Sequence, residues 1–201
     1  EFYNSQPTDY EKGLILYVGT IIRKKGVLEL PDILERVLSK YPEAHLVLIG
    51  SDSNDWQSKA ISTWELMQRD VSESVLSRIE YVGKIPFSEV KNFIRKANVC
   101  VFPTFAETLG MVTIEAMAMC KPVVNSNIGW SPELIEDGVS GFLVDPKNHS
   151  LFADRIIELL SDDNLCIKMG AAARKKTEQE FDIQHLAQEN ISFYQSLISK
   201  N

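Results

Sequence analysis

The sequence predicts an α/β protein in which a Rossmann-like, doubly wound parallel sheet carries helices on both faces. Short apolar runs alternate with amphipathic stretches over most of the 201 residues, which is typical of strands joined by crossover helices. From about residue 148 the strand patterns stop, and only helical patterns follow. The chain should therefore end in an all-helical tail.

The individual elements follow from the same two periodicities. Apolar runs predict six strands, and 3.6-residue spacing predicts five helices between them and three after them. Ser131 is a suitable N-cap for the helix that begins at Pro132, and Asp182 is suitable for the last helix. The predicted strands are 14–18, 45–49, 79–82, 99–102, 123–125 and 142–144, and the helices are 27–39, 58–68, 88–96, 111–119, 132–135, 150–160, 164–180 and 183–198.

The N-terminal residues predict a piece of a longer protein. The chain starts with Glu rather than Met, and residues 1–12 are polar and unpatterned. We expect residues 1–12 to be an interdomain linker, 13–180 to form the Rossmann-like domain, and 181–201 to be a separate C-terminal helix. One core of ordinary size fits this length.

Composition excludes several classes of protein. The formal net charge of −7 argues against a nucleic-acid binder, which needs a basic surface. Three cysteines are an odd number, so we expect a reducing, cytoplasmic compartment rather than a disulfide framework. The sequence has no apolar run of ~18 residues, the length that a transmembrane helix requires.

The most informative segment is 105–119, which follows the predicted strand 99–102. Glu107 lies in the strand-to-helix loop, Gly110 marks the helix start, and Glu115 lies about 7.5 Å further along the axis. The amides of Leu109, Gly110, Met111 and Val112 should be unpaired there and available to an anion. The two carboxylates could then bind vicinal hydroxyls of a ribose and a sugar. The alternatives are a plain loop residue and an exposed helix residue, but Glu115 has apolar neighbours, so we expect a partner for it.

A second segment, 19–26, follows the first predicted strand. It contains Gly19, Thr20, the cations Arg23, Lys24 and Lys25, and Gly26. Cations and a close backbone approach suit a phosphate, although neither a P-loop nor a dinucleotide fingerprint is present. A solvated charged turn is an equally good interpretation of this segment alone.

Other polar features carry less information. The loop 83–86, which includes Lys84 and Ile85, could present backbone groups to a base or be a plain turn. The cluster 52–55 lacks the D-x-D spacing and is better explained as a turn than as a metal site. The three histidines, His45, His149 and His185, form no ligand spacing or triad. We therefore expect no metal.

Taken together, these motifs resemble the nucleotide-binding C-terminal domain of retaining GT-B glycosyltransferases, the glycosyl transferases group 1 (family 4) type. The resemblance covers residue 14 to about 199 and rests on order and spacing. Its motifs are Val18-Gly19…Lys25-Gly26, Leu48-Ile49-Gly50, Tyr81-Val82-Gly83, Ala97–Pro103, Glu107/Glu115, Lys121–Val124 and Glu136-Asp137-Gly138…Gly141–Val144.

The resemblance implies a role for each matching residue. Lys25 and Glu107 would be catalytic, holding the donor diphosphate and the sugar hydroxyls respectively. Glu115 would bind the ribose, and the loop at Lys84 and Ile85 would pack on the base. Gly19 and the amides of 109–112 would approach the diphosphate. The co-substrate would be a nucleotide-diphosphate sugar, more often a UDP-sugar than a GDP-sugar, with no bound metal.

Two departures from the family pattern bear on the site. Many members carry Arg where this chain has Thr20, and Arg23 is the nearest substitute. Trp130 stands where a small residue is common. The acceptor glycan or lipid-linked sugar would bind an N-terminal domain outside this chain, through which the whole enzyme could also reach a membrane. Residues 181–199 should then expose an apolar face.

Three functions remain open at this point. The first is the donor-binding half of a glycosyltransferase in polysaccharide or glycolipid synthesis, which alone would bind donor without turnover. The second is a sugar-nucleotide epimerase or a phosphorylase-like protein of the same fold. The third is a non-catalytic nucleotide-sugar-binding module.

Overall fold

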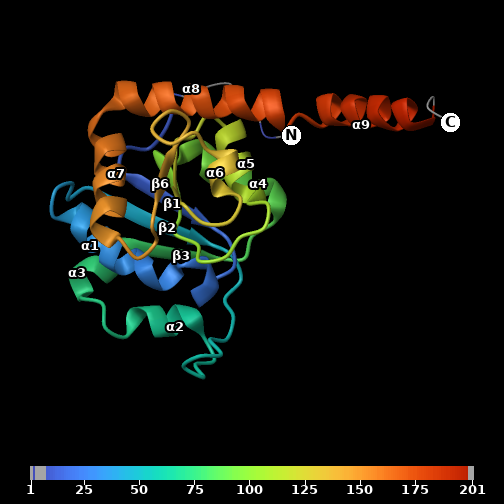
Figure 1. Cartoon of the computed structure of the whole chain (residues 1–201). Helices are drawn as coiled ribbons and strands as arrows, with labels where there is room; N and C mark the ends of the chain where they lie inside the picture. The colour runs from blue at the N-terminus through green and yellow to red at the C-terminus, as the bar shows by residue number, and fades with distance from the viewer. Residues whose placement is uncertain (1, 3–7, 199–201) are drawn as a thin grey trace.

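A computed structural model of the chain describes residue 2 and residues 8–198, and within them it contains one parallel sheet (Figure 1). The strand order is β3-β2-β1-β4-β5-β6, which confirms the doubly wound prediction. Each predicted strand is present within a residue of its expected bounds. The strands are β1 (Leu14–Val18), β2 (His45–Ile49), β3 (Ile79–Gly83), β4 (Val99–Phe102), β5 (Val123–Ser126) and β6 (Phe142–Val144).

Helices cover both faces of this sheet. α1 packs against α7 and α3 on one face, while α4 and α5 cover the other and α5 also packs on α8 (Figure 1). The helices are α1 (Leu30–Leu38), α2 (Thr63–Gln68), α3 (Glu73–Leu76), α4 (Phe87–Lys96), α5 (Met111–Ala118), α6 (Ser131–Leu134), α7 (His149–Ser161), α8 (Asp163–Glu180) and α9 (Ile183–Ile198).

The core lies along the central strands. β1 pairs in parallel with β2 on one side and β4 on the other, so both of its faces are covered and Leu14 to Tyr17 are all buried. This explains why β1 reads as a continuous apolar run rather than an alternating one. Because the strands are parallel, the loops that follow them gather at one edge, which we call the carboxyl edge.

One helix prediction was wrong in its start, and one short helix was missed. The helix predicted over 58–68 begins only at Thr63, with Ser62 as its N-cap. The residues before it form a turn in which the Asp55 carboxylate accepts from the Ser58 amide at 2.9 Å, and Lys59 adopts φ 60°, which a helix cannot accommodate. The short helix α3 was not predicted.

Two 3-10 turns precede α1, at Arg23–Lys25 and Val27–Glu29. Gly26 joins them with φ +72°, and a Cβ there would lie 1.7 Å from the Pro103 carbonyl oxygen. Only glycine fits this position. The close contact fixes the loop after β1 against the segment after β4.

The C-terminal helices differ in burial. α8 buries Cys166, Met169 and Ala173 against the domain, whereas α9 has no buried residue. Figure 1 shows α9 continuing away from the body of the protein. Asp182 Oδ1 accepts from the amides of Gln184 and His185, which confirms it as the helix cap. The expected exposed apolar face is present over the described part of 181–199, with Phe193 59% and Ile198 75% exposed.

The predicted linker falls partly outside the described residues. Its described C-terminal end is bound to the domain by contacts with α8. The Tyr10 hydroxyl donates to Asp163 at 2.9 Å, and the Lys12 ammonium lies 3.0 Å from the same carboxylate.

Candidate functional site

A pocket of about 220 Å³ opens at the carboxyl edge between the loops after β1 and β4. We call it the Lys25 pocket. Strand ends, the loop after β1 and the first turns of α5 all contribute side chains to it. It is lined by Tyr17, Val18, Gly19, Lys25, Phe87, Val90, Phe102, Thr104, Glu107, Met111, Val112, Thr113, Glu115 and Asn125.

Lys25 and Glu107 form an ion pair inside this pocket. Their side chains are 25% and 20% exposed, so both are partly shielded and still reachable. The second Glu107 oxygen accepts from the Thr108 amide at 3.0 Å. The structure therefore brings together two residues that are 82 positions apart in the sequence.

The start of α5 supplies free backbone donors. Gly110 is the N-cap residue with φ 67°, in the left-handed region. Within the described chain, the amides of Leu109, Gly110, Met111 and Val112 make no backbone hydrogen bond. Four unpaired amides at a helix N-terminus form an anion-binding surface.

Glu115 lies half-buried on α5 and lines the same pocket. The partner expected for it is absent from the described residues, which give its carboxylate no hydrogen bond or ion pair. Burial raises its pKa above the ordinary value. The carboxylate thus carries a desolvation cost that a hydrogen-bonding ligand would relieve.

Tyr17 and Asn125 form part of the pocket wall and were not predicted. The buried Tyr17 hydroxyl donates to the Thr20 carbonyl at 3.0 Å, and desolvation and then the Glu107 charge raise its pKa. Asn125 Nδ2 donates to Thr113 Oγ1 at 2.9 Å. Its Oδ1 has no partner among the described residues. Tyr17 and Asn125 lie near the carboxyl ends of β1 and β5. The rule that ligands bind beyond the carboxyl ends of parallel strands could therefore have identified both residues from the sequence.

The other predicted residues are spread along the same edge. Thr20 is exposed, Leu109 is 45% exposed, and Lys84 is exposed. Ile85 packs against the core. The Arg23 guanidinium does not line the Lys25 pocket, because it pairs with Asp55 through Nε and Nη2 at 2.9 Å each.

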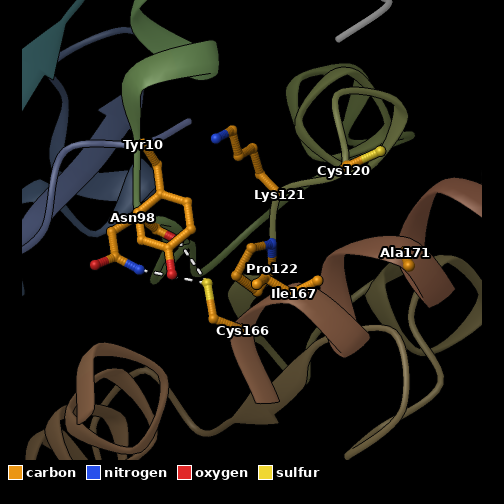
Figure 2. A pocket seen from close by; sticks show the side chains of 8 residues that line it. All are labelled: Tyr10, Asn98, Cys120, Lys121, Pro122, Cys166, Ile167 and Ala171. Atoms are coloured by element: carbon orange, nitrogen blue, oxygen red, sulfur yellow. Dashed lines mark hydrogen bonds between the residues drawn. The ribbon is translucent and has the colours of Figure 1, made fainter. Parts of the chain in front are cut away.

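A second hollow, of about 60 Å³, lies at the opposite, amino edge of the sheet (Figure 2). Asn98 lies one residue before β4 and Lys121 two residues before β5, and both line the hollow together with Tyr10 and Cys166. Figure 2 shows the Cys166 sulfur close to Tyr10 and Asn98, and the Asn98 side-chain amide donates to it at 3.4 Å.

Lys121 at this edge is 1% exposed, and its ammonium has no hydrogen-bond partner among the described residues. The nitrogen lies 5.5 Å from the centre of the Tyr10 ring. Desolvation lowers its pKa. The hollow faces away from the Lys25 pocket and takes no part in that site.

Three further observations concern the described part of the chain. It contains no cluster of three or more His, Cys, Asp or Glu side chains that could hold a metal. None of its helices is long and apolar enough to cross a membrane. Cys100, Cys120 and Cys166 are all free thiols.

Comparison with known proteins identifies the family. The model of the family "Glycosyl transferases group 1" matches residues 1–176. The chain belongs to this family. Among curated group 1 relatives, the capsular polysaccharide biosynthesis glycosyltransferase CapM of Staphylococcus aureus is 28% identical over 188 residues, covering 94% of this chain and 47% of CapM.

Solved structures agree on the fold. The C-terminal domain of the group 1 protein LpcC from Francisella tularensis has a TM-score of 0.75 at 24% identity, covering 90% of this chain and 96% of that one. Anabaena HepE in complex with UDP-glucose has a TM-score of 0.78 at 22% identity, covering 97% and 54%. The chain thus corresponds to the C-terminal half of a GT-B glycosyltransferase and spans about half the length of its curated relatives.

Proposed function

We propose that this chain is the donor-binding half of a retaining glycosyltransferase, which transfers a hexosyl group from a nucleotide-diphosphate sugar to an acceptor. The observation that carries the proposal is the lining of the Lys25 pocket, which includes the Lys25 ammonium, the Glu107 and Glu115 carboxylates, and Met111 and Val112, two of the four residues whose amides are free at the start of α5. Residues 13–180 would form the donor domain. Residues 181–201 would return to an N-terminal domain that supplies the acceptor glycan or lipid-linked sugar.

Lys25 and the α5 amides suit the diphosphate. A diphosphate offers several anionic oxygens, and charge-assisted bonds to an ammonium and to backbone N–H groups are its usual ligands. Gly19 lets the backbone come close to it. On transfer, negative charge builds up on the leaving diphosphate, and the same fixed donors stabilise it without reorganisation.

The two glutamates suit hydroxyl groups. Glu115 has no partner in the described structure, and a carboxylate can accept two hydrogen bonds from the vicinal hydroxyls of a ribose. When Lys25 turns to the diphosphate, Glu107 is released and can accept from the donor sugar. One ligand therefore satisfies both ends of the present ion pair.

The base and the sugar are assigned from a structural neighbour and from the loop after β3. We propose a UDP-sugar because HepE, a structural neighbour, is seen with UDP-glucose. The loop at Lys84 and Ile85 follows β3 at the same edge and would pack on the base. Thr20 and Arg23 remain proposed phosphate-loop residues. Arg23 would have to leave Asp55 to reach a phosphate.

A thermal-shift panel tests the proposal. The chain is heated with UDP, GDP, ADP or NAD, and each series is repeated for Glu115→Ala, Lys25→Ala and the matched controls Glu43→Ala and Lys40→Ala. Both control residues are exposed and lie before β2, at the amino edge. A ligand present at 100 times its Kd adds ~2.7 kcal/mol of stability.

We expect stabilisation by UDP that both site variants lose and both controls keep. Stabilisation by GDP alone would correct the base. Equal shifts in the site variants and the wild type would refute the site. Incubation of UDP-glucose with the full-length enzyme and no acceptor separates the epimerase alternative, because only an epimerase would convert the donor.

A further inference from the structure

A second groove, of about 820 Å³, lies at the carboxyl edge beside the Lys25 pocket. We call it the Trp56 groove. The segments after β1 and β4 meet between this groove and the Lys25 pocket. There the Phe105 amide donates to the Lys24 carbonyl at 2.9 Å. Its volume is within the usual range of ligand sites, ~300–1,000 Å³. The residues used below are Arg23, Lys24, Asp55, Trp56, Phe105 and Lys147.

The loop that carries Trp56 is held firmly in place. Asp55 is 4% exposed, and it accepts two bonds from Arg23 and further bonds from Ser58. Arg23 holds the pKa of this carboxyl well below its usual range. Three residues earlier, Asp52 Oδ1 accepts from the amides of Thr63 and Trp64 at 3.0 Å. The geometry of this loop is thus set before any ligand arrives, which reduces the ordering cost of binding.

The loop presents aromatic side chains to solvent. Trp56 is 91% exposed, and Phe105 is partly exposed in the same groove. An indole offers a flat apolar face and one N–H donor. Asn54 and Gln57 beside it add amide donors and acceptors. A flat apolar face beside amide groups suits the C–H face and the hydroxyls of a pyranose ring.

Three cations and two carboxylates line the groove, which leaves a surplus of one positive charge. Arg23 is paired with Asp55, and Glu29 is the other carboxylate of the lining. Lys24 and Lys147 have no ion-pair partner among the described residues. This surplus stands out because the whole chain carries −7. It would attract a negatively charged ligand.

We propose that the Trp56 groove binds an anionic oligosaccharide. One sugar ring stacks on Trp56, and the anionic substituents face Lys24 and Lys147. The groove shares no lining residue with the Lys25 pocket, and its proposed ligand contacts do not include Arg23, so the proposal does not rest on nucleotide binding. Carbohydrate is favoured over other anions because the exposed Trp56 face suits ring C–H groups and the Asn54 and Gln57 amides suit hydroxyls.

The test is a calorimetric titration of the 201-residue chain, without nucleotide, with two tetrasaccharides of equal length. One is the alginate tetramer of mannuronate, and the other is uncharged maltotetraose. We expect the alginate tetramer to bind at least about tenfold more tightly than maltotetraose. Trp56→Ala should weaken its binding by about tenfold, and the double variant Lys24→Gln/Lys147→Gln should remove most of its salt dependence.

Ile61→Ala is the matched control, because Ile61 is 80% exposed on the same loop and does not line the groove. This variant should bind the alginate tetramer as the wild type does. Failure of the alginate tetramer to bind, or an unchanged affinity in Trp56→Ala, would overturn the proposal. Equal binding of maltotetraose would overturn the charge assignment. UDP thermal shifts in Trp56→Ala should match the wild type, which keeps this outcome separate from that of the donor site.

Discussion

Lys25 and Lys121 lie at opposite edges of the same sheet, and their surroundings are opposite as well. Lys25 is partly exposed, paired with Glu107 and set in a pocket of about 220 Å³. Lys121 is buried, has no hydrogen-bond partner within the described chain, and borders a hollow of about 60 Å³. The Lys25 charge is balanced by a carboxylate and is accessible from solvent, which suits a ligand. The Lys121 ammonium lacks a hydrogen bond to the described residues and is inaccessible, so its burial lowers the stability of the fold.

The largest expected effect is on ligand affinity at the carboxyl edge. Lys25→Ala should weaken UDP binding by roughly 10- to 100-fold, because a charge-assisted bond is worth ~1.5–3 kcal/mol. Calorimetry on the variant and on Lys40→Ala measures the difference. An affinity within twofold of the wild type would show that Lys25 does not touch the diphosphate.

The second effect is on stability at the amino edge. Lys121→Met should stabilise the fold by ~1–3 kcal/mol at pH 7, because it removes an unsatisfied buried polar group. The Lys121 pKa is lowered in the folded state, so unfolding takes up a proton and wild-type stability rises with pH. The advantage of Met should therefore fade as the pH approaches ~10.

Urea unfolding at pH 7 and pH 10 measures this advantage. UDP binding should be unchanged, since the two edges are separate. A variant less stable than the wild type at pH 7 would mean that the Lys121 ammonium is satisfied in solution.

The third prediction concerns Glu115, whose carboxylate should lower the stability of the fold and increase the affinity for UDP. Glu115→Gln should stabilise the fold by ~1 kcal/mol near neutral pH, because it removes a desolvated charge. The raised pKa of Glu115 means that the wild-type penalty is present when the group is ionised and absent once it is protonated. The gain should vanish below about pH 4. UDP affinity should fall by about tenfold.

Denaturant midpoints at pH 7 and pH 3.5 and a UDP titration provide the measurements. The opposite stability change, a loss at neutral pH, would indicate a structural partner for Glu115 rather than a vacant acceptor.

The smallest effect separates the sugar from the nucleotide. Glu107→Gln keeps the shape of the side chain and removes its charge. It should leave UDP affinity within about twofold of the wild type and weaken UDP-glucose by about fivefold, since only the sugar offers hydroxyls to this side chain. Parallel titrations with the two ligands check the ratio. Equal losses of affinity for UDP and UDP-glucose would mean that Glu107 positions Lys25 and does not bind the sugar.

Sequence periodicity was sufficient to predict the strands of the sheet, because each strand is a buried apolar run followed by a turn. It failed where side-chain hydrogen bonds and backbone conformation decide the local structure. The start of α2 was placed too early because Asp55 and Lys59 turn the chain in a way that apolar spacing does not record. The pairing of Arg23 with Asp55, 32 residues apart, also depends on the strand order.

The site shows the same limit. The rule that ligands meet parallel strands at their carboxyl ends located Lys25, Glu107 and Glu115 in one pocket. It would equally have found Asn125 at the end of β5 had each strand end been inspected. The burial of Lys121 could not be predicted, because it depends on Tyr10, which packs over it from the N-terminal segment.

Under the proposed function, the Lys25–Glu107 pair would also select among the anions of a cell. While the pair is closed, the ammonium of the pocket is already neutralised, and any incoming anion has to separate it. Inorganic phosphate replaces the carboxylate but leaves Glu107 half-buried with fewer partners. A sugar nucleotide brings a diphosphate for the lysine and hydroxyls for the glutamate in one molecule. On this proposal, an abundant small anion would bind more weakly than a sugar nucleotide without any steric barrier.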